Sequence, residues 1–298
     1  MRVCIAGGSG LIGSNVSSAL RSEGHEVWLL TRSKQLGKHQ IHWDPSTGSI
    51  EEGELEGFDA ILNLCGENIA SGRWTNQLRR KIRDSRISST ALLTSTLAKT
   101  KNPPRVFLQA SAIGYYGNCG DQMLTEASSA GNSFLSQVCL DWEQTARDAE
   151  TLGIRLVRMR IGVVLSREGG ALQRMLLPFS LGLGGKLGSG EQYFSWIGEH
   201  DLTRAMLFCL FQEKMCGAVN LVAPAPVRNS EFTRTLASKL RRPAFLHVPA
   251  ALLRLLLGEM AEELLLASCR VYPEALLEHG FSFEHSELDN ALDFLLKY

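Results

Sequence analysis

Glycines at a characteristic spacing follow the first apolar run of the chain. The segment Gly7-Gly8-Ser9-Gly10-Leu11-Ile12-Gly13 satisfies both Gly8-x-Gly10-x-x-Gly13 and Gly7-x-x-Gly10-x-x-Gly13. One glycine permits a sharp turn, another leaves room for a pyrophosphate, and Gly13 lets the next helix lie close to the strand. The free N–H groups at that helix start favour phosphate. We predict a dinucleotide-binding turn with contacts at Gly7, Gly10, Leu11, Ile12 and Gly13; the alternative is a structural turn without a ligand.

The second candidate site follows the next apolar run, Glu26–Thr31, which continues as Thr31-Arg32-Ser33-Lys34. An NAD-binding unit places Asp or Glu at this point to bind the ribose hydroxyls. Arg32 can instead pair bidentately with the 2′-phosphate of NADP, and the hydroxyls of Thr31 and Ser33 can add hydrogen bonds. The sequence therefore predicts NADP(H) as the cofactor, unless these residues form only a solvated basic loop.

The elements that must position these residues alternate between short apolar runs and amphipathic stretches. This alternation predicts an α/β fold, a Rossmann-type doubly wound parallel sheet with a small C-terminal α/β lobe. The predicted strands are Arg2–Ala6, Glu26–Thr31, Ala60–Leu64, Arg105–Ala110, Ile154–Arg160 and Ala218–Val222. The predicted helices are Leu11–Glu23, Asn76–Lys99, Ser133–Leu152 and Leu202–Gln212.

The chain is long enough for one domain with an added lobe. We expect residues 1–220 to form the NADP-binding domain and residues 221–298 to form a lobe that contributes to the substrate pocket. Residues 40–50 are predicted as a small β-excursion, residues 181–191 as an irregular glycine-rich loop, and Phe245–Val248 as a strand. The loop belongs to a longer substrate segment, residues 181–198, within the first domain.

Composition narrows the classes of function. Lys plus Arg and Asp plus Glu number 31 each and the pI is near 7.0, which argues against binding to nucleic acid or to a membrane surface. The seven cysteines lack CxxC spacing and mostly sit in apolar runs, which suits a reducing compartment. With neither a signal peptide nor a long apolar span in the sequence, we expect a cytoplasmic protein. The histidines show no metal-ligand spacing, so no metal is expected.

Several further motifs together resemble the extended short-chain dehydrogenase/reductases, and among them the atypical "epimerase family" group. This group includes chains catalogued as nucleoside-diphosphate-sugar epimerases or as cell-division inhibitors, although no residue here points to a cell-division partner. The resemblance spans nearly the whole chain. It rests on Gly7–Gly13, Asn63-Leu64-Cys65-Gly66-Glu67-Asn68-Ile69, Arg73-Trp74, Asp84-Ser85-Arg86, Gly114-Tyr115-Tyr116-Gly117, Asp141-Trp142-Glu143, Arg160-Ile161-Gly162-Val163-Val164-Leu165, Leu181–Gly190 and Phe194-Ser195-Trp196-Ile197.

The resemblance implies further cofactor contacts. Leu64, Cys65, Gly66 and Glu67 should line the groove on the adenosine side, at the carboxyl edge of the sheet where ligands of such folds bind. Arg86 and Arg160 are placed to meet phosphate or nicotinamide-side groups, and Lys81 is a further candidate.

The proton relay of the family is missing from this chain. Extended short-chain dehydrogenases use a Ser or Thr and a Tyr-x-x-x-Lys pair, in which the lysine lowers the tyrosine pKa from about 10 toward neutrality. Alignment on the motifs places Ala112 at the serine position, with Ser111 one residue earlier, and Leu135 and Cys139 at the Tyr and Lys positions. No Tyr-x-x-x-Lys occurs anywhere in the sequence.

Two classes of function therefore stay open. The first is NADP-dependent hydride transfer on a small carbonyl or sugar-nucleotide-like substrate. Its acid/base groups would be displaced to Ser111 and Tyr116, with Tyr115 and Glu67 as alternatives and Arg160 stabilising negative charge. Tyr116 has the alternative role of filling space at the strand end. The second class is a non-catalytic NADP-sensing regulator or scaffold.

We expect the substrate, whose identity the sequence does not reveal, to bind between the sheet edge and the lobe. Its pocket would be lined by residues 182–190, Gln192, Phe194 and Trp196. Asp201, next to His200, is predicted to lie in the N-cap region of the helix Leu202–Gln212 rather than in a catalytic dyad. A homodimer through the helices Asn76–Lys99 and Ser133–Leu152 is an option, although Leu92, Leu93 and Leu97 can equally be core.

Overall fold

A computed structural model describes residues 1–297, and its centre is an eight-stranded sheet. The strand order is β13-β8-β6-β5-β1-β2-β3-β4, and every neighbouring pair is parallel except β3 and β4. The strands are β1 Arg2–Ala6, β2 Glu26–Thr31, β3 Gln40–Asp44, β4 Ser49–Ile50, β5 Ala60–Asn63, β6 Val106–Ala112, β8 Arg155–Ile161 and β13 Gly217–Leu221. The order runs outward in both directions from β1 and β5, so the predicted doubly wound sheet is confirmed.

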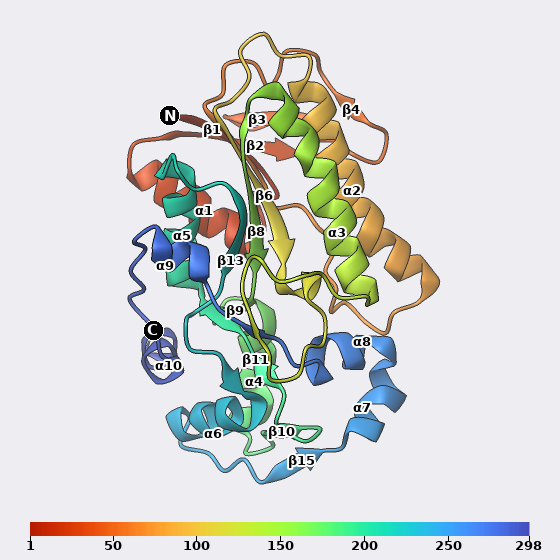
Figure 1. The fold of residues 1–298 in the computed structure, drawn as a ribbon, viewed down its shortest axis with the longest axis vertical. Helices are drawn as coiled ribbons and strands as arrows, with labels where there is room; N and C mark the ends of the chain where they lie inside the picture. The colour runs from red at the N-terminus through yellow and green to blue at the C-terminus, as the bar shows by residue number, and fades with distance from the viewer. Residues whose placement is uncertain (298) are drawn as a thin grey trace.

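Helices cover both faces of this sheet (Figure 1). The helices α1 Leu11–Ser22, α5 Glu199–Phe211 and α9 Glu274–Glu278 lie on one side, and α2 Asn76–Leu97 and α3 Phe134–Ala146 on the other. Alternate residues of β1 point into two cores: Val3 and Ile5 into the first, Cys4 and Ala6 into the second. This two-sided burial explains why the central strands read as continuous apolar runs.

The expected elements are largely present, with shifted ends. The helix predicted over 133–152 is α3 followed by a 3₁₀ segment, η2 Arg147–Leu152. The helix expected from Leu202 begins at Glu199 with Gly198 as its N-cap. The prediction for Asp201 was therefore wrong. Its buried carboxylate lies in the first turn of α5 and accepts hydrogen bonds from the backbone N–H groups of Glu284 and His285 at 3.0 and 2.8 Å.

The remaining elements gather at one end of the molecule, below the sheet in Figure 1. They are η1 Ile113–Tyr115, β7 Met123–Leu124, β9 Val163–Leu165, α4 Gly170–Ser180, β10 Gly185–Leu187, β11 Tyr193–Phe194, β12 Trp196–Gly198, β14 Val227–Arg228, α6 Asn229–Lys239, β15 Leu246–Val248, α7 Ala250–Leu257, α8 Glu259–Ala261, the π-helical η3 Glu262–Leu266, β16 Arg270–Val271 and α10 Leu288–Leu296. The pairs β10–β15, β11–β14, β12–β9 and β16–β7 form small sheets. The expectation of a wholly irregular segment over 181–191 was wrong, because β10 lies within it.

The residues after 220 contribute to more than one apolar cluster, and in one of them Leu288 and Leu292 of α10 pack with Phe232 of α6, apart from the sheet core. Leu276 and Phe281 pack in the same apolar cluster as Val157 of β8 and Leu221 of β13. The boundary at residue 220 stays a prediction. Between residues 1 and 297, none of the helices combines the length and the apolarity that crossing a membrane requires.

Candidate cofactor groove and polar cluster

The turn between β1 and α1 has the geometry that the glycine spacing predicts. Gly7 has a φ of +81°, and a Cβ on it would lie 2.9 Å from the carbonyl carbon and oxygen of Leu64. A Cβ on Gly13 would lie 2.3 Å from the carbonyl oxygen of Gly7. The backbone is thus packed too tightly for side chains at both positions. Gly10 caps α1 without a side-chain hydrogen bond, and the first turn carries no acidic residue, which leaves N–H groups of Leu11 and Ile12 for an anion.

Arg32 is the first of the basic residues in the adjoining loop after β2. Arg32 is exposed beyond the end of β2, and within residues 1–297 no salt bridge engages it. Burial raises the pKa of the Cys65 thiol to about 12, and the positive charge of Arg32 opposes this rise. Because β2 and β5 both pair with β1 in parallel, the loops that follow them leave the same edge of the sheet on either side of the end of β1. The hydroxyls of Thr31 and Ser33 accept hydrogen bonds from the backbone N–H groups of Ser33 and Gln35, each at 3.1 Å.

The segment after β5, which is predicted to contact the cofactor, is held in place by α2. The N–H of Leu64 donates to Ala6 at 2.9 Å, and the N–H of Glu67 donates to the hydroxyl of Ser85 at 2.9 Å. Arg86 donates to the carbonyl oxygens of Glu67 and Ile82 at 3.2 and 2.8 Å. Burial lowers the pKa of its guanidinium. Arg86 thus links the segment after β5 to α2 through hydrogen bonds.

The remaining predicted site residues differ in whether their side chains are exposed or buried. The side chain of Lys81 is exposed on α2. Gln192, Phe194 and Trp196 were expected to line a substrate pocket, and for Trp196 this is wrong. Its side chain is completely buried, and its indole N–H donates to the carbonyl oxygen of Ala225 at 3.1 Å. Phe194 packs on Phe232, and Gln192 donates to the backbone of Leu187 and Leu265.

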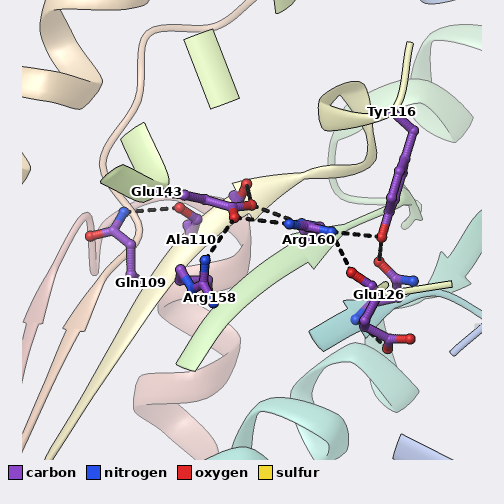
Figure 2. Close-up of polar contacts among 9 residues, drawn as sticks. Gln109, Ala110, Tyr116, Glu126, Glu143, Arg158 and Arg160 are labelled. Carbon is purple, nitrogen blue, oxygen red and sulfur yellow. Dashed lines mark hydrogen bonds and ion pairs between the residues drawn. The ribbon is translucent and has the colours of Figure 1, made fainter. Parts of the chain in front are cut away.

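A buried polar cluster joins β6, β8 and α3 (Figure 2). Glu143 of α3 accepts hydrogen bonds from Ser111 at 2.8 Å and from Nε and Nη2 of Arg160 at 2.8 and 3.0 Å. Arg158 approaches the same carboxylate at 3.4 Å. Arg160 also donates to the hydroxyl of Tyr116 at 3.0 Å, and its guanidinium carbon lies 3.4 Å from the ring centroid of Tyr115.

The electrostatics of this cluster follow from its burial. Burial lowers the pKa of Arg160, and the hydrogen bonds and charge of Glu143 more than offset this, so the pKa ends above its ordinary value. Burial raises the pKa of Tyr116 to about 12, against the opposing charge of Arg160. The Tyr116 phenol therefore stays protonated near neutral pH, and it donates to the side-chain oxygen of Asn220 at 2.7 Å.

These contacts bear on the two predicted catalytic residues. Ser111 and Tyr116 are both buried, with 3% and 1% of their surface exposed. This geometry favours the space-filling role for Tyr116, while a catalytic role for either residue stays a prediction. Arg160, placed by the resemblance near the cofactor, is committed to Glu143 and Tyr116.

The positions of the missing relay are also occupied by buried side chains. A Cβ on Gly114 would lie 3.3 Å from Cβ of Leu135 and 4.0 Å from the sulfur of Cys139. Burial raises the pKa of the Cys139 thiol to about 11. Within the described residues 1–297, no group of three His, Cys, Asp or Glu side chains is arranged to hold a metal ion.

Four residues of this polar cluster were not predicted as site residues from the sequence: Glu143, Arg158, Glu126 and Asn220. Glu143 was visible within the motif Asp141-Trp142-Glu143, but nothing in that motif shows which strands its carboxylate meets. Its partners on β6 and β8 lie 32 and 17 residues away in the sequence.

Comparison with known proteins agrees with this architecture. Residues 3–221 match the model of the "NAD dependent epimerase/dehydratase family", and residues 248–295 match a domain of unknown function. An epimerase family protein of Mycobacterium bovis is 44% identical over 292 residues, covering 98% of this chain and 96% of the relative. The mouse epimerase family protein SDR39U1 is 38% identical, with 98% of each chain covered.

Two solved structures share both sequence and fold. Human epimerase family protein SDR39U1 in complex with NADPH superposes with a TM-score of 0.91 at 35% identity, covering 100% of this chain and 99% of that one. A Corynebacterium glutamicum nucleoside-diphosphate sugar epimerase gives a TM-score of 0.83 at 33% identity, covering 99% of this chain and 58% of that one. The chain belongs to the NAD dependent epimerase/dehydratase family.

Proposed function

We propose that this protein binds NADP(H) in the groove between the glycine turn and the segment Leu64–Glu67. The observation that carries the proposal is the free guanidinium of Arg32, exposed at the end of β2 beside a helix start without acidic residues. A 2′-phosphate carries about −1.5 to −2 charges if it titrates like other phosphomonoesters, and a fork of N–H donors suits it. The human relative with NADPH bound supports the same choice.

The reaction we propose is hydride transfer between NADP(H) and a small carbonyl or sugar-nucleotide-like substrate. When bound, the nicotinamide would supply or accept the hydride. Ser111 offers a neutral hydroxyl at the carboxyl end of β6. Once it has released Glu143, it would give its proton to the substrate oxygen on which hydride addition places negative charge, and it would regain a proton from water; in the reverse direction it would accept that proton. Tyr116 and Arg160 would hold Glu143 and the strand end in place during this exchange.

A second function, NADP sensing without turnover, is favoured by two observations. Leu135 and Cys139 stand at the Tyr and Lys positions, and the raised pKa of Tyr116, about 12, keeps its phenol protonated near neutral pH and makes it a poor proton donor. In this alternative, cofactor occupancy would control contacts with a partner instead of driving chemistry.

The cofactor assignment is tested by reversing one charge. In Arg32→Asp the carboxylate repels the 2′-phosphate and can accept from ribose hydroxyls, so the affinity ratio of NADPH to NADH should fall by at least about tenfold. The ratio is measured by titrating both nucleotides in a calorimeter. Lys34→Asp is the matched control, with the same charge change in the same loop. Equal ratios in Arg32→Asp and the wild type would refute the assignment.

The two functions are separated by turnover. The NADPH-loaded protein is mixed with aldehydes, ketones and nucleotide sugars while the absorbance of the reduced nicotinamide is followed. Oxidation that depends on one of these compounds supports the enzyme. Tight NADPH binding with an unchanged absorbance across the whole series supports the sensor.

A further inference from the structure

A second cavity opens on the α3 face of the sheet and shares the polar cluster of Figure 2. It has a volume of about 470 Å³ and is lined by Tyr115, Glu126, Ala127, Ser128, Ser129, Leu140, Glu143, Gln144, Arg147, Arg158, Arg160 and Ala218. None of the residues of the glycine turn or of the loop carrying Arg32 is among them. The volume is within the range of small-molecule sites.

Positive charge dominates this cavity. Three arginines line it, Arg147, Arg158 and Arg160, and two carboxylates, Glu126 and Glu143. Glu143 is already bound to Arg160 through both of its oxygens. Burial raises the pKa of Glu126, which weakens its negative charge. With Glu143 ionised, the lining carries a net positive charge whether or not Glu126 holds its proton.

Charged groups of both signs act on Arg158, two carboxylates and two arginines. Burial lowers the pKa of Arg158, the charge of Glu143 opposes this, and the positive charges of Arg147 and Arg160 lower it further. Glu150 is the other carboxylate that acts on Arg158. The distance of 3.4 Å between Arg158 and Glu143 is long for a charge-assisted hydrogen bond.

Polar atoms in this cavity lack partners. The Nε–H of Arg158 and one oxygen of Glu126 are buried without a hydrogen bond to any residue that the structure describes. The side chains of Gln144 and Arg147 are exposed at the mouth. Buried polar groups are almost always satisfied in folded proteins, so the interior beside this cavity is unusually poor in hydrogen-bond partners for Arg158 and Glu126.

We infer that this cavity is a binding site for a small anion carrying a carboxylate or phosphate group, held between Arg158, Arg147 and Gln144. Arg158 lines the cavity and supplies positive charge, Arg147 adds a second guanidinium at the mouth, and the amide of Gln144 adds a neutral donor. The site is separate from the proposed cofactor groove.

The test is a calorimetric titration of the whole protein with inorganic phosphate and, separately, with succinate, at constant ionic strength maintained with chloride. Each titration is repeated with excess NADPH, because phosphate can also bind at the glycine turn. Saturable binding that persists with NADPH is expected for at least one anion. Stronger binding of phosphate or of succinate then tells which anionic group the cavity prefers.

Variants locate the bound anion. Arg147→Ala removes one charged contact at the mouth and should weaken the binding by roughly tenfold. Arg158→Lys keeps the charge but removes the fork of guanidinium N–H donors, and should also weaken it. Arg234→Ala removes an exposed arginine of α6 outside the cavity and should leave the affinity unchanged. The inference is overturned if neither anion saturates, if NADPH abolishes all binding, or if Arg147→Ala binds as the wild type does.

Discussion

At the scale of single residues, one carboxylate organises the polar interior. Glu143 binds Arg160 through two short hydrogen bonds and also receives the hydroxyl of Ser111. The side chains of Glu143 and Arg160 are only 4% and 3% exposed. Leaving either charge unpaired in such a place costs about 3–5 kcal/mol. The residues of this cluster therefore act together, and the Ser111 hydroxyl is not an isolated group.

Tyr116 provides the sharpest test of a single side chain. In Tyr116→Phe, Arg160 loses an acceptor and Asn220 loses a donor inside the core. The free energy of unfolding should fall by about 1–3 kcal/mol, while the affinity for NADPH should stay the same. Both are measured, by urea denaturation and by cofactor titration.

Tyr115→Phe is the matched control for this substitution. Its ring stays over Arg160, so little stability should be lost. If Tyr116→Phe is as stable as the wild type but abolishes a turnover that the wild type shows, the acid/base role is right and the space-filling role is wrong.

At the scale of elements, the start of α3 depends on a residue far along the chain. Glu263 of η3 accepts hydrogen bonds from the hydroxyl of Ser133 at 2.7 Å and from the backbone N–H groups of Phe134 and Leu135 at 3.0 and 2.8 Å. A carboxylate at a helix N-terminus satisfies free N–H groups and the positive end of the helix. These hydrogen bonds hold η3 against the start of α3, which packs on the sheet.

Glu263→Ala should therefore loosen two segments at once. We expect a loss of about 1–3 kcal/mol in the free energy of unfolding, and faster amide hydrogen exchange both at the start of α3 and across η3. Glu278→Ala, which removes an exposed carboxylate from α9, should change neither. Faster exchange at α3 alone would mean that η3 is held by its other contacts.

The elements also show what the sequence can and cannot predict. β1 and β2 were predicted to the residue, because apolar runs bounded by glycine or by polar residues are a local signal. The short strands β10 and β12 were missed, because each exists only through pairing with a distant partner, β15 or β9. Trp196 in β12 was predicted wrongly for a related reason. The sequence alone does not show whether an aromatic side chain is buried in a core or lines a pocket.

The candidate site was predicted where chemistry depends on local spacing. The glycine turn and Arg32 could be predicted from the order of residues along the chain alone. To predict that Glu143 and Arg158 meet, one must know how α3 packs on β8. To predict their cavity, one must also know where the loop 126–129 lies. Long-range packing of this kind is not encoded in any short motif.

At the scale of the whole molecule, one segment of the C-terminal region returns to the sheet core, while α10 packs with α6 in a cluster apart from it. Phe281 packs in the core beside β8 and β13, and Asp201 receives two backbone N–H groups from the same return segment. Unfolding of this segment would expose the sheet core. We therefore expect cooperative unfolding of the described chain.

The same buried interior makes the whole protein sensitive to alkali. Burial raises the pKa of Cys65, Cys209 and Cys269 to about 12 and that of Cys139 to about 11, from an ordinary value of 9.0. The folded state then holds these protons more tightly than the unfolded state does. The resulting stability is fully present below pH 9 and is lost as the pH rises toward 11–12.

Each such thiol can remove up to about 1.4 kcal/mol per pH unit above its unfolded pKa. Urea denaturation at a series of pH values should show a nearly constant free energy of unfolding just below pH 9 and a steep fall above it. Cys139→Ala removes one of these groups and should make the fall shallower, whereas Cys216→Ala, which removes a thiol from the surface, should not. A free energy of unfolding that stays level through pH 10 would show that water reaches these thiols, and that the interior is less tightly closed than its packing indicates.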